Sequence, residues 1–217
     1  MTAFNDDIFK SEALLKTNYI EQEEVCNRLA AKYSEASWIH LKSDNGTDFT
    51  FKIGGEKVNI VSSIVKKGEL GSSPNIEINV VPLEGTANGI LIVDGSVPYL
   101  GIGVLEKPIR IKVENGFISS IEEDTKNAKI LSDNLKSFEN KNVYNIAEFG
   151  VGLNPNAKLR GIMLEDEGVF GTIHIGIGTS ISLGGRTDAP IHYDLIIKDV
   201  NVELDGQTIQ KGRNLYI

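Results

Sequence analysis

Two of the three histidines lie close together near the C-terminus, in segments that fit a metal site. His174 stands in the run 171–178, GTIHIGIG, and His192 opens the tripeptide His192-Tyr193-Asp194. Residues two apart in an extended strand point to the same face, so His192 and Asp194 would project side by side. His174 alternates with isoleucines and is placed opposite small glycines, where another group has room to approach. The pattern predicts metal ligands.

Two isolated carboxylates could extend this site. Glu77 alternates with Ile76 and Ile78, and Glu148 stands among apolar and small residues in the run 145–152. An ionised carboxylate resists desolvation, and a bound cation would offset that cost. Taken singly, each glutamate is more typical of an ion pair with Lys or Arg, and each histidine of a hydrogen-bonded structural residue, than of a metal ligand. Spacing alone leaves both possibilities open.

The remaining histidine and a run of acids fit structural roles better. His40 lies between Ile39 and Leu41, which predicts a surface residue of a strand and not a ligand. The triplet 165–167, EDE, is interpreted as mainly structural and solvated, because alternate members of an extended run face opposite ways.

Composition narrows the classes of function. The chain has 217 residues, enough for one substantial domain, with 41% hydrophobic and 24% charged residues. It has 22 Lys plus Arg against 30 Asp plus Glu, a net charge of −8, which argues against nucleic acid as a partner. With one cysteine, Cys26, there is no internal disulfide, and a metal must be bound by nitrogen and oxygen. Apolar runs such as 89–93 are far shorter than the roughly 20 residues of a spanning helix, so we expect a cytoplasmic protein without a membrane partner.

Hydrophobic periodicity indicates many strands and few helices. Helical spacing covers residues 20–33 and 125–138, and Asn45-Gly46 predicts a hairpin between strands at 37–42 and 49–53. Further strands are expected at 58–65, 75–81, 89–93, 109–113, 117–121 and 143–150. This order favours an α+β domain with a largely antiparallel or mixed sheet.

Several segments, in order and approximate spacing, resemble a known family. The segments 148–157, 164–167, 171–178, 184–185 and 189–194 resemble the C-terminal half of the thermophilic aminopeptidases that include aminopeptidases T and S. Upstream, 45–51 and 74–77 followed by Pro82 resemble earlier blocks of the same domain. The resemblance implies a metal-binding catalytic-type domain over residues 20–217, after an N-terminal segment 1–19. The additional N-terminal α/β domain of the family is then absent.

The resemblance also implies a ligand set and an activity. Family members bind two metal ions, and the matching positions here are Glu77, Glu148, His174, His192 and Asp194. Glu148 would bridge the ions and Glu77 would complete one coordination shell, and these carboxylates would be the catalytic residues that handle the proton. The implied function is a zinc-, cobalt- or manganese-dependent aminopeptidase-like hydrolase, in which metal-activated water attacks the N-terminal peptide bond of a small peptide.

Two other functions stay open. The same superfamily includes a ring-cleaving dioxygenase of dihydroxypyridine, and His174, His192 and Asp194 alone would form the two-histidine, one-carboxylate set typical of its single Fe(II). A non-catalytic binding or assembly module is the third. It is suggested by the short N-terminal segment, by Ile181 where the family commonly has a tyrosine and by Gly168 where it usually has a lysine. Exposed apolar surface on a truncated domain would also favour a homo-oligomer.

Overall fold

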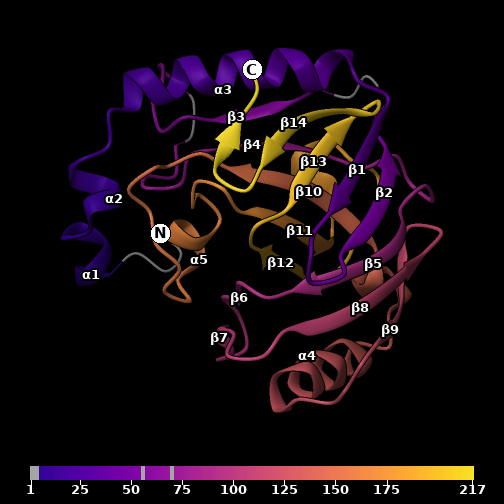
Figure 1. Ribbon diagram of the computed structural model, residues 1–217. Helices are drawn as coiled ribbons and strands as arrows, with labels where there is room; N and C mark the ends of the chain where they lie inside the picture. Colours follow the sequence, from indigo (N-terminus) through magenta and orange to yellow (C-terminus); the bar gives the residue numbers. More distant parts are fainter. Residues whose placement is uncertain (1–4, 55–56, 69–70) are drawn as a thin grey trace.

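The computed structural model describes residues 5–54, 57–68 and 71–217, and in these ranges two antiparallel sheets form the body of the molecule (Figure 1). The first sheet contains, in spatial order, β15 (Asn214–Leu215), β14 (Gln207–Lys211), β13 (Asn201–Leu204), β1 (Trp38–Lys42), β2 (Asp48–Lys52), β5 (Asn88–Val93), β8 (Ile109–Glu114) and β9 (Phe117–Ile121). The second contains β3 (Asn59–Val61), β4 (Glu77–Val80), β10 (Ile146–Gly152), β11 (Ile173–Gly178), β12 (His192–Ile197), β6 (Ser96–Val97) and β7 (Gly103–Val104).

The two sheets differ in how their strands are buried. In β1 and β8 of the first sheet, buried apolar residues alternate with residues on the outward face, as in a sheet with one face against the core. In β4, β10 and β11 of the second sheet every residue is buried. These three strands therefore form the interior of the second sheet, and the polar residues on them are removed from water.

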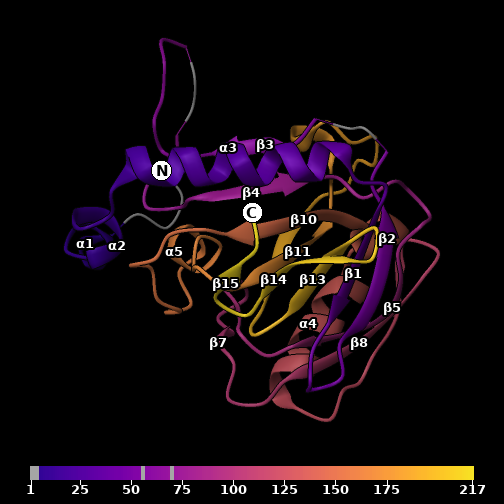
Figure 2. The same ribbon diagram turned by 45° about the horizontal axis from the view of Figure 1, so that its top comes forward.

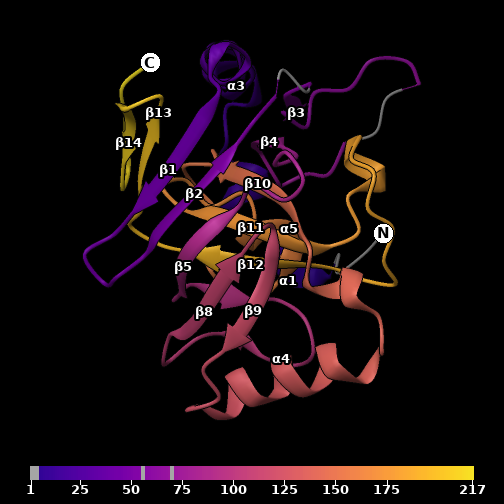
Figure 3. The same cartoon turned by 90° about the vertical axis from the view of Figure 1, so that its right-hand side faces the viewer.

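Helices cover the sheets at opposite ends of the molecule (Figures 1 and 3). α3 (Tyr19–Glu35) begins at Asn18, whose side chain accepts the amide of Glu21, and it packs Leu29 and Tyr33 into the core beside β3 and β4. α4 (Lys126–Ser137) begins at Thr125, which caps the helix in the same way. Figure 2, turned by 45°, shows α3 crossing the top of the molecule, with α4 far below it.

Residues 5–19 form two short helices, α1 (Asp6–Phe9) and α2 (Glu12–Leu15), that lie near the one-turn helix α5 (Met163–Asp166). Ile8 and Ala13 are buried. The Thr17 hydroxyl donates to Asn154 Oδ1 at 2.8 Å, just after β10 ends. This contact ties the N-terminal segment to the strand that carries Glu148.

The structure confirms the predicted fold class, an α+β arrangement with antiparallel sheets and few helices. Both predicted helices form, and the predicted hairpin forms as β1–β2. The strands expected at 109–113 and 117–121 also form, and they pair with each other as β8 and β9. Three strands are shorter than predicted. β3 covers 59–61 and β4 covers 77–80, and β10 begins only at Ile146 because residues 141–144 form a 3-10 turn, η1 (Lys141–Tyr144), capped by the side chain of Asn140.

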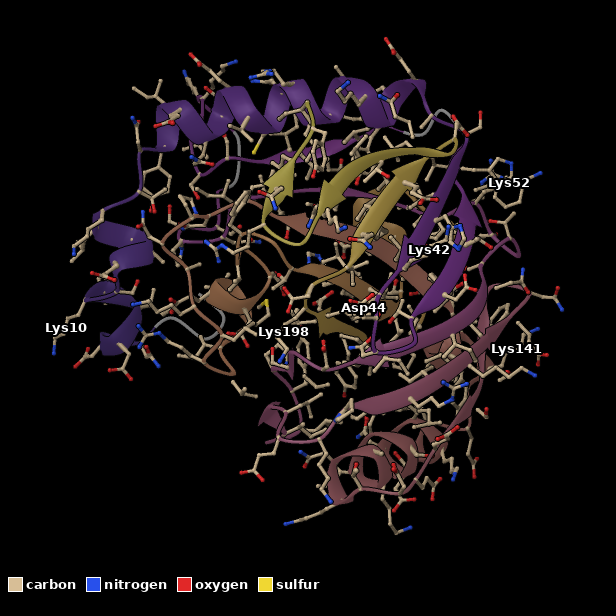
Figure 4. All side chains as sticks on the ribbon, viewed as in Figure 1. Lys10, Lys42, Asp44, Lys52, Lys141 and Lys198 are labelled. Atoms are coloured by element: carbon tan, nitrogen blue, oxygen red, sulfur yellow. The ribbon has the colours of Figure 1, made fainter. Side chains whose placement is uncertain are left out.

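Lys10 and Lys141 are exposed and point outward at the edge of the molecule (Figure 4). Across the described ranges, no helix combines the length and the apolar character needed to cross a membrane.

Candidate metal centre

The five predicted ligands meet on one face of the second sheet. Neighbouring strands place each of them opposite a glycine: Glu77 pairs with Gly152, Glu148 with Gly176, His174 with Gly150, His192 with Gly178, and Asp194 with Gly176. Residues directly opposite in an antiparallel pair project to the same face. The ligands and glycines therefore alternate across β4, β10, β11 and β12. Mostly apolar residues of the same strands, such as Ile78, Phe149, Ile175 and Leu195, occupy the other face.

The glycines leave the space that the ligands use. A Cβ atom on Gly150 would lie 2.0 Å from His174 Nε2, and one on Gly176 would lie 2.8 Å from His192 Nε2. No side chain fits at these two positions unless a histidine moves. The expectation that His174 stands opposite small glycines is confirmed, and the reason is close approach of an imidazole to the neighbouring backbone.

The ligand atoms form two overlapping groups of three. Glu77, Glu148 and His174 make one group, Glu148, His192 and Asp194 make the other, and the ligand atoms in each lie within 4.8 Å of one another. His174 Nε2 is 3.5 Å from Glu77 Oε2 and 3.7 Å from Glu148 Oε1. His192 Nε2 is 2.8 Å from Glu148 Oε2 and 3.2 Å from Asp194 Oδ1. Glu148 belongs to both groups, in the central position that the family resemblance implies for it.

The hydrogen bond at Nδ1 of His192 is of the kind that a metal ligand makes. Its Nδ1 lies 2.7 Å from the carbonyl oxygen of Thr179, which accepts a hydrogen bond, so Nδ1 carries the proton. In neutral imidazole the Nε2 lone pair then points at two carboxylates. That arrangement is repulsive unless Nε2 is protonated or a cation lies between the three groups. A histidine whose second nitrogen donates to a carbonyl is the usual outer-shell arrangement of a metal ligand.

Buried oxygens without partners support a cation. Among the described residues, Glu77 Oε2 and Asp194 Oδ1 are buried and have no hydrogen-bond partner. Both belong to the two groups of three. Each lies near a histidine Nε2, at 3.5 Å for Glu77 Oε2 and 3.2 Å for Asp194 Oδ1, but neither forms a hydrogen bond within the described part of the chain. Buried carboxylate oxygens without hydrogen bonds are costly, and a divalent ion bound by nitrogen and oxygen would remove the cost. The residues present therefore fit a metal ion.

The pKa values show how strongly the metal-free cluster attracts positive charge. Burial raises the pKa of Glu77 to about 7, and the neighbouring Glu148 adds to this shift. Burial lowers the pKa of His174, but the carboxylates of Glu77 and Glu148 outweigh burial and raise it to about 9. The pKa of Asp194 stays below its ordinary value in spite of burial, because His192 stabilises the charged form. Protons occupy the place that a cation would take.

Two further residues contact Asp194. The Tyr99 hydroxyl donates to Asp194 Oδ2 at 2.7 Å, and the Tyr99 ring stacks on Tyr193 with ring centroids 4.8 Å apart. Glu167 lies on another side, where burial and the charge of Asp194 raise its pKa well above the ordinary value. The side chain of Asn75 donates to Glu167 Oε2 at 3.3 Å. The sequence analysis missed both residues as neighbours of the site.

The acidic triplet corrects an expectation. Glu165, Asp166 and Glu167 are buried, with 1%, 0% and 8% of their surface exposed, and are not solvated. Alternation does not apply to them, because they lie in and directly after α5. Asp166 accepts the backbone amides of Arg160 and Gly161, and Glu165 accepts that of Lys158, so these two are structural as predicted.

The other residues singled out from the sequence lie outside the cluster. His40 is on the outward face of β1, where its Nε2 is 2.6 Å from Asp48 Oδ1. Ile181, at the position where the family commonly has a tyrosine, is 52% exposed in the 3-10 turn η2 (Ile181–Leu183). Two cavities, of about 420 and 440 Å³, lie beside β3 and β9, and no residue of the cluster lines either of them.

Comparison with known proteins places this fold and site in a class. The model of the NicX family, 2,5-dihydroxypyridine 5,6-dioxygenase, matches residues 11–215, so the chain belongs to this family. The 2,5-dihydroxypyridine 5,6-dioxygenase of Pseudomonas putida KT2440 is 25% identical over 186 residues, which are 81% of this chain and 53% of that protein. The chain thus spans about half the length of the curated relative it matches.

Two solved structures share the fold. The dihydroxypyridine dioxygenase of P. putida KT2440 superposes with a TM-score of 0.79 at 22% identity, covering 90% of this chain and 59% of that one. Wild-type AmpT from Thermus thermophilus gives 0.73 at 16% identity, covering 95% and 57%. The expected likeness to aminopeptidase T is confirmed for the fold, and the family is that of the dioxygenase.

Proposed function

We propose that this chain carries the Fe(II) centre of a ring-cleaving dioxygenase acting on a dihydroxylated nitrogen heteroaromatic ring. The observation that supports it most is the buried cluster of two histidines and three carboxylates in a chain that matches the dihydroxypyridine dioxygenase family over residues 11–215. His174, His192 and Asp194 are of the two-histidine, one-carboxylate type that holds non-haem iron with open positions. In the structure they belong to the two groups that share Glu148, so a single iron would lie between the groups. Bound ferrous iron would supply oxygen activation.

The two remaining carboxylates, Glu77 and Glu148, would transfer protons to and from the substrate. Glu77 and Glu148 lie on the same face as the three iron ligands, and both are buried. A pKa near 7, as burial gives Glu77, suits a group that takes a proton from a substrate hydroxyl and returns it later. Glu148, between both histidines, would keep the two imidazoles in place and share in that transfer.

Oxygen consumption tests this proposal. The purified chain is loaded with ferrous iron without air and then given 2,5-dihydroxypyridine and oxygen in an electrode cell. We expect one iron per chain and oxygen uptake that requires the ring. His192→Ala should abolish both, whereas His40→Ala, which removes the histidine outside the cluster, should change neither. A folded, iron-loaded sample that takes up no oxygen with dihydroxylated pyridines would contradict the proposal.

A second function is favoured by one specific observation, the sharing of Glu148 between two groups of three ligands. A shared carboxylate is what a two-metal hydrolase needs, with the ions polarising a peptide carbonyl and activating water. This candidate, an aminopeptidase-like enzyme, predicts two zinc, cobalt or manganese ions per chain and release of amino acids from small peptides or amides. Elemental analysis together with both assays separates the candidates, and zero metal in a folded sample would favour a non-catalytic module.

A further inference from the structure

Tyr99 reaches the metal cluster from a distant part of the chain. It lies between β6 and β7, 95 positions before Asp194, and its hydroxyl donates to Asp194 Oδ2 at 2.7 Å. The other oxygen of the same carboxylate, Oδ1, is buried without a hydrogen-bond partner among the described residues and faces His192 Nε2 at 3.2 Å. The two oxygens of Asp194 thus have different surroundings.

The loop that carries Tyr99 is held in place by the fold. Leu100 has a positive φ of 59°, a conformation that is uncommon for a bulky residue and persists where the surroundings enforce it. At the base of the loop, the Ser96 hydroxyl donates to Asp166 Oδ2, and at its far end Gly103 lies against the backbone of Gly161. Asp166 also binds the amide of Gly161, so one buried carboxylate anchors both sides of the loop.

The ring of Tyr99 is fixed as well as its backbone. It stacks on Tyr193 with an interplanar angle of 30°. Tyr193 is the residue between the ligands His192 and Asp194, and its own hydroxyl donates to Asn134 at 3.2 Å, away from the cluster. Stacking thus sets the direction of the Tyr99 hydroxyl by a contact that does not involve a ligand atom.

We infer that Tyr99 is a positioning residue that makes Asp194 a one-oxygen metal ligand, with Oδ1 toward the ion and Oδ2 held by the phenol. A free carboxylate can bind an ion through both oxygens and then occupies two coordination positions. Holding Oδ2 leaves the second position for substrate, oxygen or water. Hydrogen bonds to ligating carboxylates commonly have this orienting role. The inference rests on the proposed metal centre and is independent of the reaction catalysed there.

A pair of matched variants tests it. Tyr99→Phe keeps the stacked ring and removes the hydroxyl that holds Asp194. Tyr193→Phe removes the hydroxyl of the other ring of the pair, which contacts Asn134. Cobalt(II) is titrated into each metal-free protein against a competing chelator, and the visible absorption of the bound ion is recorded. We expect Tyr99→Phe to weaken cobalt binding about 10- to 100-fold, because Asp194 loses the hydrogen bond that orients it. The visible spectrum should also change, because Oδ2 is then free to bind the ion. Tyr193→Phe should match the unmodified protein.

The outcomes separate this inference from the proposed function. If the unmodified protein binds no cobalt, both the proposed metal centre and the role of Tyr99 are contradicted. If it binds cobalt and Tyr99→Phe gives the same affinity and spectrum, only the role of Tyr99 is overturned.

A second measurement needs no variant of Tyr99. Infrared difference spectra of protein labelled with ¹³C in the aspartate carboxylates, with and without metal, report how Asp194 binds. Widely separated carboxylate stretches are expected for binding through one oxygen. Closely spaced stretches would overturn the inference.

Discussion

His40 in the first sheet and His174 in the second have similar neighbours but different surroundings. Each lies near two carboxylates of its own sheet: His40 is 2.6 Å from Asp48 and 3.7 Å from Glu203, and His174 is 3.5 Å from Glu77 and 3.7 Å from Glu148. The His40 side chain is 30% exposed, whereas that of His174 is 1% exposed. Water screens the first group and not the second. Residue types alone thus do not make a metal site, and burial decides.

Space is the second difference between the two sheets. His40 and Asp48 already lie at hydrogen-bond distance, so the pair is complete without an ion. Around His174 the carboxylate distances are longer, one oxygen has no partner among the described residues, and glycine is the neighbour across the strand. A site for a cation needs this looser arrangement.

The largest difference in metal binding is expected between two single variants, one that removes His174 and one that removes His40. His174→Ala takes away a ligand that no nearby side chain replaces, so we expect the affinity for ferrous iron or cobalt to fall by more than about 100-fold, beyond the usual cost of losing an outer-shell partner. His40→Ala should leave metal binding unchanged. Isothermal titration of both variants checks this, and equal affinities would break the comparison between the sheets.

A glycine substitution should disturb the site without changing a ligand. The Cβ of Gly150→Ala would lie 2.0 Å from His174 Nε2 and must displace the ring, so we expect metal binding to be lost and stability to fall by about 1–3 kcal/mol. At Gly54 in the described part, an added Cβ meets only Leu83, at 3.8 Å, so Gly54→Ala is the matched control. Metal content and urea unfolding of the two variants are compared. Normal metal content in Gly150→Ala would contradict the packing argument.

Metal removal should expose a pH dependence of stability. Burial lowers the pKa of His174, but Glu77 and Glu148 outweigh it and raise the value from 6.5 to about 9. When the pKa of a histidine is higher in the folded state than in the unfolded state, the folded protein is stabilised fully at pH values below the pKa of the unfolded state. This stabilisation is lost as the pH rises through the pKa of the folded state. Chelated protein should therefore lose stability between about pH 6.5 and 9 relative to loaded protein, whose ligands are already deprotonated.

Calorimetry with and without chelator measures this difference. The raised pKa of Glu77, from 4.5 to about 7 through burial, acts in the same direction. The gap in Tm between loaded and chelated protein should widen as pH rises. A gap that narrows over this interval would show that protons do not occupy the cation site.

The smallest effect is expected on the outward face of the first sheet. Glu203 lies 3.2 Å from Lys42 Nζ and 3.7 Å from His40 Nδ1, and the Lys42 side chain is 46% exposed. Exposed ion pairs contribute little, so Glu203→Gln should change the free energy of unfolding by less than about 1 kcal/mol. Denaturant titration measures it. A larger loss would mean that burial is not what separates the two histidine groups.

Strand alternation explains why the grouping of the proposed ligands could be predicted from the sequence. Glu77, His174 and the pair His192 and Asp194 keep strict period two, and the ladder between neighbouring strands then brings them to one face. Glu148 obeys the same rule only after a register shift in β10 between Ile146 and Glu148. That irregularity has no signal in the residue types.

Tyr99 and Glu167 could not be predicted in this way. Tyr99 lies in an irregular loop, and its contact with Asp194 depends on how β6 and β12 pair across a long separation in the sequence. Glu167 directly follows α5, a one-turn helix that the alternation of residues in strands does not predict. Neighbours of a site that come from loops require the tertiary structure.

The cluster is not equally closed on all sides, and this affects how quickly ions exchange. The His192 side chain is 24% exposed, while those of Glu77, Glu148 and His174 are at most 6% exposed. An ion or a chelator therefore reaches the cluster past His192. A single iron should therefore leave in one phase of chelation. Two ions should leave in two phases, because the one held deeper by Glu77 and His174 would depart only when the outer position is free or the sheet opens locally.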